Sequence, residues 1–253
     1  MRGALVLVLA LSVAGCSHTW FQFHVSAAEA SAIDQNKNAL AATAASRDLN
    51  ALAQVVDLDG RRGAEILVAG MTVESTSADV QHARLTRALY FGIMGDGEDP
   101  LSALDMDLGS MAARVAQRVA VNQAQQMGFG AIASFIGAVG DDDGTRLTEM
   151  QMSLTRGQVA TCQGLDPIIS YNAGILGHIH SQMAESDPTY LAWRARVQSI
   201  HLVHYVCGSQ HAVFLLSRNA GEPGVRALGW HFMRPDQWER LRPRLRQALD
   251  LPT

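Results

Sequence analysis

The sequence predicts an α+β fold in which several packed helices accompany an antiparallel meander at the C-terminal end. Three strand-like runs, at residues 200–207, 211–218 and 225–233, follow one another with only short turn segments between them. Earlier segments with helical spacing do not alternate regularly with strands, and this favours α+β over a doubly wound parallel sheet. An apolar share of 48% in 253 residues is typical of a packed globular protein.

The first predicted element is a short strand near the N-terminus. Residues 19–25 alternate between apolar and polar side chains, and a period of two is typical of a strand. The competing interpretation places the rings of Trp20, Phe21 and Phe23 in the headgroup layer of a membrane. Residues 26–45 are rich in alanine, so they form either a tether or a lightly packed helix.

Helices and two further short strands are expected between this segment and the meander. Capping residues and apolar residues at helical spacing indicate helix starts at Ser46, Ser77, Asp99, Ser110 and Asp187. The strands are expected at residues 65–73 and 148–154, which are short and apolar or alternating. The uncharged run 127–140 predicts a buried segment, and residues 236–249 predict a final helix that restarts at Pro243.

Composition and missing motifs exclude several classes of function. A formal net charge of −4 and an isoelectric point near 6.1 give no basic field, so nucleic acid is excluded as a partner. The chain has one lysine, Lys37, and contains no Ser-x-x-Lys, G-x-S-x-G, Walker or H-E-x-x-H motif. The sequence therefore assigns no catalytic residue.

The first seventeen residues have the layout of a secretory signal peptide. Arg2 precedes an apolar run at residues 4–11, and this run is too short to span a bilayer. The signal closes with valine, alanine, glycine and Cys16, an ending that resembles the lipobox of bacterial lipoproteins. The resemblance implies that Cys16 carries lipid after the signal is cut before it. With Ser17 as the next residue, it also implies an outer-membrane protein that faces the periplasm.

The resemblance divides the chain into three parts. Residues 1–15 form the lipoprotein signal peptide, residues 16–45 the lipidated anchor and tether, and residues 46–253 a single globular domain. Attachment is firm because each buried methylene contributes about 0.8 kcal/mol and two acyl chains suffice for stable anchoring. The expected function is a non-catalytic binding or scaffolding role at the membrane, with no cofactor.

The two other cysteines are expected to pair. Once Cys16 carries lipid, Cys162 and Cys207 are the remaining thiols of a chain in an oxidising compartment, and this favours a disulfide. The alternative is that both are buried, unpaired cysteines that pack as small apolar residues.

Three histidines of the meander provide an alternative function. A two-residue turn at Gly208 and Ser209 would place His204 on the same sheet face as His211, and a symmetric next loop would place His211 opposite His231. Three imidazoles on one face suit zinc with an open fourth position. The alternative prediction is a zinc-dependent hydrolase that uses these three residues.

Arginines crowd the final predicted helix around an apolar stripe. Arg240, Arg242, Arg244 and Arg246 give this helix a basic surface that could contact an anionic component of the envelope. In the other interpretation the stripe packs on the core and the arginines remain solvated.

Two acidic segments share the pattern D-x-D-G-x-x-x-x-E, at residues 57–65 and 141–149. Carboxylates two positions apart on a glycine turn can converge on calcium. The pattern is one residue short of a helix-loop-helix calcium loop and lacks its first acid, so a solvated turn before a strand is expected at both places.

Overall fold

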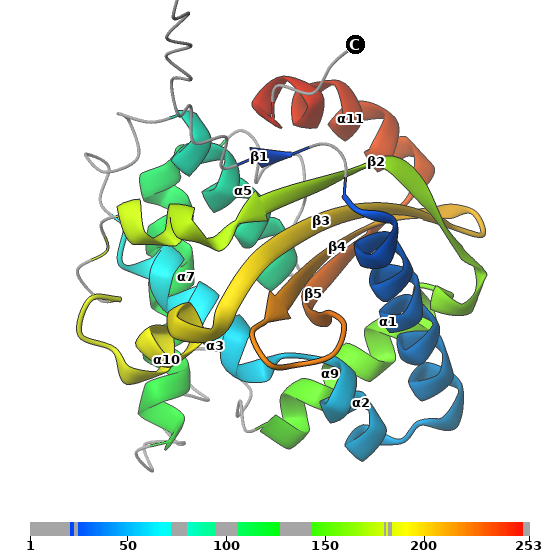
Figure 1. Cartoon of the computed structure of the whole chain (residues 1–253), viewed down its shortest axis with the longest axis horizontal. Coiled ribbons are helices and arrows are strands. Elements are labelled where there is room, and N and C mark those ends of the chain that lie inside the picture. The colour runs from blue at the N-terminus through cyan, green and yellow to red at the C-terminus, as the bar shows by residue number, and fades with distance from the viewer. Residues whose placement is uncertain are drawn as a thin grey trace, which may run out of the picture.

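A computed structural model describes residues 21–22, 25–71, 80–94, 106–126, 143–179, 181 and 184–249 (Figure 1). Its elements, in chain order, are β1 (Phe21–Gln22), α1 (Ala27–Ser46), α2 (Leu49–Val55), α3 (Leu58–Ala69), α5 (Val80–Met94), α7 (Leu108–Gln126), α9 (Asp143–Arg156), η2 (Val159–Thr161), β2 (Cys162–Asn172), η3 (Ala173–His178), α10 (Pro188–Arg196), β3 (Val197–Cys207), β4 (Gln210–Asn219), β5 (Arg226–Met233) and α11 (Pro235–Leu249).

The strands form one antiparallel sheet in the order β1-β2-β3-β4-β5, so the predicted α+β class and the C-terminal meander are confirmed. The turn between β3 and β4 consists of Gly208 and Ser209, as expected. Gly208 has a φ of 60°, a conformation that glycine adopts without steric cost at this position of a two-residue hairpin.

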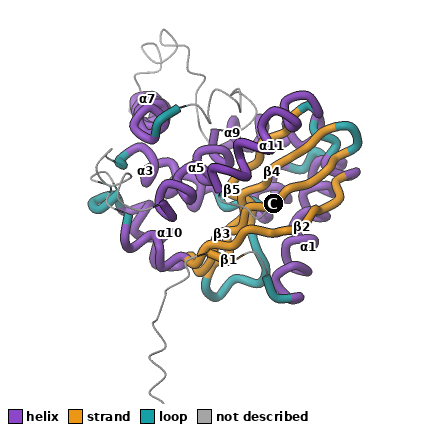
Figure 2. The backbone as a smooth tube through the Cα atoms, turned by 90° about the horizontal axis from the view of Figure 1, so that it is seen from above, coloured by secondary structure: helices purple, strands orange, loops and turns teal. Residues whose placement is uncertain are grey.

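Helices cover both faces of the sheet. One face packs against α3, α5 and α11, with α7 and α10 packed behind them on α3, and the other face packs against α1, α2 and α9 (Figure 1). In Figure 2 the strands run between α10 and α5 on one side and α1 on the other. Because side chains of a strand alternate, Ile200 and Leu202 of β3 join the first core, whereas Val203 and Tyr205 join the second.

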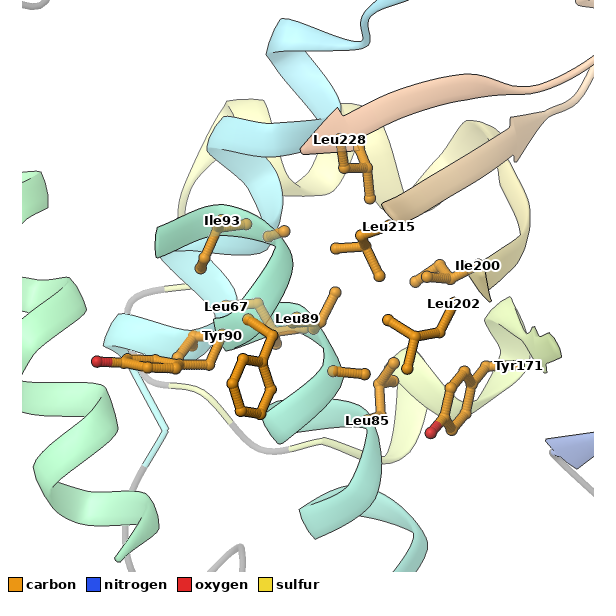
Figure 3. Close-up of a cluster of buried hydrophobic side chains, with 14 of the residues drawn as sticks. Leu67, Leu85, Leu89, Tyr90, Ile93, Tyr171, Ile200, Leu202, Leu215 and Leu228 are labelled. Atoms are coloured by element: carbon orange, nitrogen blue, oxygen red, sulfur yellow. The ribbon is translucent and has the colours of Figure 1, made fainter. Parts of the chain in front are cut away.

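The first core is built where α3 and α5 press against the sheet. Figure 3 shows Leu67 of α3 and Leu89 of α5 directed toward Leu202 and Leu215 of the strands. The approach is close because a Cβ at Gly229 of β5 would lie only 2.0 Å from the carbonyl oxygen of residue 92 in α5. Glycine at this position lets helix and strand meet backbone to backbone.

Residues 27–46 form a packed helix, which decides between the two alternatives for the alanine-rich segment. Ser26 caps α1 in a reciprocal capping box with Glu29, and Ile33 and Leu40 are buried in the second core. The packed part of the chain therefore begins with α1 and not at residue 46. The strand expected nearby is present as β1, and α2 is capped by Asp48 rather than by Ser46.

The two strands expected at residues 65–73 and 148–154 are wrong, because these segments lie in α3 and α9. Short apolar runs do not distinguish a buried strand from a buried helix. In α9, Met150 and Leu154 satisfy both periods, but Met152, which a strand would have buried with them, is 52% exposed.

Two of the remaining helix predictions agree with the structure: the second half of α5 is buried, and α10 begins at Pro188 with Asp187 as its cap. The predicted helix start at Ser110 is wrong, because α7 begins at Leu108 and runs through this residue. The final helix is present as α11, but it continues through Pro243 and does not restart there. The predicted caps Ser77 and Asp99 and the run 127–140 lie outside the described residues.

Candidate functional site

A cluster of three rings connects the meander to the final helix. His204 lies on β3, His211 on β4 and Trp238 on α11. The strand register pairs His204 with Val213 and His211 with Val206, so the two histidines lie diagonally on one face. The prediction that they share a face is confirmed. We call these three residues the His–Trp cluster.

The two imidazoles are joined by a hydrogen bond along the face of the indole. Nε2 of His204 lies 3.0 Å from Nδ1 of His211, and the ring planes differ by 15°. Trp238 is nearly parallel to both, with ring centroids 3.9 Å from His204 and 5.0 Å from His211. One ring nitrogen must donate and the other accept, so this arrangement accommodates the neutral pair or a pair with one extra proton.

Burial keeps the His–Trp cluster uncharged near neutral pH. Burial, followed by the charges of His211 and Arg242, lowers the pKa of His204 to about 4. Burial also lowers the pKa of His211, with Arg242 acting in the same direction and Glu239 opposing both. The cluster therefore resists protonation in the folded chain.

His231 does not join the other two imidazoles. It lies on the same sheet face, but the register pairs it with Val213, while His211 pairs with Met233, so the predicted opposition of His211 and His231 is wrong. The register begins one position off the symmetric one, with Ser217 opposite Arg226, and an irregularity between Leu215 and Leu216, where β5 carries one extra residue, shifts it by one more. His231 is instead buried beside Phe91 of α5, with ring centroids 6.5 Å apart.

The part of the chain that the structure describes contains no group of three or more His, Cys, Asp or Glu side chains placed to hold a metal ion. For the predicted zinc site, the structure thus brings together His204 and His211 and leaves out His231.

A serine–histidine pair on the opposite face was missed at the level of sequence. Ser199 Oγ lies 3.0 Å from Nε2 of His201, two residues along β3, and His201 is fully buried. Burial lowers the pKa of His201 to about 4, although Glu29 acts against it. Its Nδ1 has no hydrogen-bond partner among the described residues, so no carboxylate orients the ring as in a catalytic triad. The signal in the sequence was the spacing of two residues between Ser199 and His201, which places both side chains on the same face of a strand.

The first acidic segment is the start of α3 and not a solvated turn. Asp57 caps this helix by accepting a hydrogen bond from the backbone N–H of Gly60 at 2.8 Å, and it is 1% exposed. Its carboxylate also pairs with Arg196 of α10 at 2.7 Å and accepts from Asn219 of β4 at 2.9 Å. The expected solvated turn is therefore wrong at Asp57, because protein groups bind its carboxylate.

The exposed arginines of α11 include Arg240 and Arg242. Arg240 pairs with Asp236 at 3.2 Å, and Arg234 pairs with the same carboxylate at 3.1 Å. The side chains of Arg244 and Arg246 lie outside the described residues. Trp238 and Leu241 are buried in the first core, as the predicted apolar stripe requires.

Cys162 and Cys207 form a disulfide that joins β2 to β3. They are direct partners in the antiparallel register, at the end of β3 that leads into the Gly208 turn. Both are buried in the second core. The predicted pairing of these two cysteines agrees with the structure.

No family model, no curated protein and no solved structure matches this chain. Among the described residues, no helix is both long and apolar enough to cross a membrane. Cys16 lies outside the described residues.

The disulfide leads to the first prediction. We expect Cys162 and Cys207 to resist alkylation in the unfolded protein until a reductant is added, because the bond persists after the chain unfolds. Mass spectrometry of the alkylated peptides measures this. Labelling of both thiols without reductant, in protein isolated from its native compartment, would contradict the prediction.

Proposed function

We propose that this chain is an outer-membrane lipoprotein that faces the periplasm and has a non-catalytic binding or scaffolding role. The observation that carries the proposal is the Cys162–Cys207 disulfide between paired strand positions, together with the lipobox-like ending at Cys16. Disulfides persist in oxidising compartments and are rare in the cytosol. An exported chain with its first cysteine lipidated would leave these two to pair.

The distance between Cys16 and the fold supports attachment close to the membrane. Phe21, the first residue of β1, follows Cys16 by five residues. A chain of five residues reaches at most about 18 Å when fully extended. The lipid would therefore hold the β1 edge of the sheet near the headgroups.

The position of α11 supports an anionic partner at the same membrane surface. In Figure 1, β1 and α11 lie along the same upper side of the molecule. Residues 234–249 contain five arginines and two acidic residues in a chain whose net charge is −4. An anchored protein would thus present its basic helix, including Arg240 and Arg242, toward anionic headgroups.

The geometry favours this role over the zinc-dependent hydrolase. A catalytic zinc site needs three protein ligands, and the sheet register pairs His231 with Val213 rather than with His211. We therefore propose the binding role alone.

Lipidation is tested by Cys16→Ser in the full-length protein. The wild type should fractionate with the outer membrane and carry an acylated N-terminal Cys16 by mass spectrometry, whereas the variant should be released, because its chain offers no acyl site. Equal membrane retention of the variant, together with an unmodified wild-type N-terminus, would overturn the anchor.

The basic surface of α11 is tested with vesicles and the Cys16→Ser protein, so that the lipid makes no contribution. We expect binding to vesicles containing anionic phospholipid, weakened by salt and by the double substitution Arg240→Gln and Arg242→Gln, because each basic residue near such a surface contributes about 1 kcal/mol.

The matched control is Arg47→Gln with Arg156→Gln, which removes the same charge from exposed positions at the C-terminal ends of α1 and α9. Equal loss of binding in both double variants would show that net charge alone acts, and absence of binding to anionic vesicles would remove the membrane surface as a partner of α11.

A further inference from the structure

We propose that the His–Trp cluster is a pH-sensitive latch that holds α11 on the sheet near neutral pH and releases it in acid. This inference does not depend on lipidation or on the compartment. It rests on the contacts among His204, His211 and Trp238.

The hydrogen bond between the imidazoles determines in which protonation state α11 stays on the sheet. At 3.0 Å, one of the two facing nitrogens must supply an acceptor lone pair. When both rings are protonated, two N–H groups and two positive charges face each other at this distance. The pair must then separate, and the surface on which Trp238 is stacked is lost.

The charged groups around the pair oppose double protonation. From α11, Arg242 adds positive charge near both imidazoles, and Glu239 offsets part of it at His211. From β5, the residue opposite His211 is the uncharged Met233. From β2, the residue opposite His204 is the uncharged Leu165.

The attachment of α11 depends strongly on this cluster. Trp238 and Leu241 are the buried side chains of α11 among its described residues. Trp238 stacks directly on both imidazoles, so separation of the rings removes one of these two anchors. The helices α3 and α5 on this face pack through aliphatic side chains, among them Leu67 and Leu89, against Leu215 of β4.

The direction of the pH effect follows from linkage. Because burial lowers the pKa of His204 below that of a solvated imidazole, the open state binds protons more readily than the closed state. Opening is therefore unfavourable above a pH of about 6.5 and becomes more favourable as pH falls toward 4. If opening takes up one proton, each unit by which the pH falls in this range increases the population of the open state about ten-fold.

Hydrogen exchange of the full-length protein between pH 7 and 4.5, corrected for the intrinsic pH dependence of exchange, tests the latch. We expect protection of α11 to fall at least about ten-fold more than protection of β3 and β4. In His211→Gln, the side-chain amide can donate to neutral His204 or accept from protonated His204 after a flip. This variant should therefore keep α11 protected in acid.

The matched control is His201→Gln, which removes a buried histidine of the opposite face and should leave the acid response of α11 unchanged. If His211→Gln folds poorly, His204→Gln makes the same test from the other strand. The proposal is overturned if α11 and the sheet lose protection together in the wild type, or if the Gln variants of the pair open in acid as the wild type does.

Discussion

The buried carboxylate of Asp57 is the interaction on which the arrangement of the structure depends. It lies where α3 begins, beside the β5 edge of the sheet, and the backbone N–H of Asp57 donates to Ala227 of that edge strand. Its side chain accepts from its own helix, from Arg196 of α10, and from Ser217 and Asn219 of β4. A buried charge is tolerated only when it is paired and hydrogen-bonded, and these four donors fulfil that condition.

The same helix continues this pattern across the edge of the sheet. Glu65 lies between Arg61, one turn earlier, and Arg146 of α9, at 3.2 and 3.4 Å. Because α9 belongs to the opposite layer, this pair connects the two layers of helices. Arg61 also donates to the carbonyl oxygens of Ile93 in α5 and Leu228 in β5. Its guanidinium thus satisfies backbone acceptors of both a helix and the edge strand. The β5 edge is thus held by paired charges, whereas α11 is held by the stacked rings of His204, His211 and Trp238.

Local signals were sufficient for some elements and misleading for others. The meander and α10 were predictable because a two-residue glycine turn and an Asp-Pro start are set by neighbouring residues. The segment that begins at Asp57 was not, since an Asp-Gly pattern is as typical of a turn as of a helix start. The position of Asp57 is fixed by hydrogen bonds from Arg196 and Asn219, which lie 139 and 162 residues away in the chain. The shared sheet face of His204 and His211 followed from turn length, whereas the position of His231 depended on a shifted and irregular register that no local motif signals.

The most direct test of this account is the free energy of unfolding, measured in urea, of Asp57→Asn against Asp59→Asn. Asparagine still caps a helix, so the first substitution removes the charge while it keeps the capping group. We expect a loss of about 3–5 kcal/mol, because Arg196 and the polar groups of β4 lose their buried anion. Asp59 is 64% exposed and approaches its arginines no closer than 3.8 Å, so its substitution should cost about 1 kcal/mol or less. Equal, small losses in the two variants would contradict the central role of Asp57.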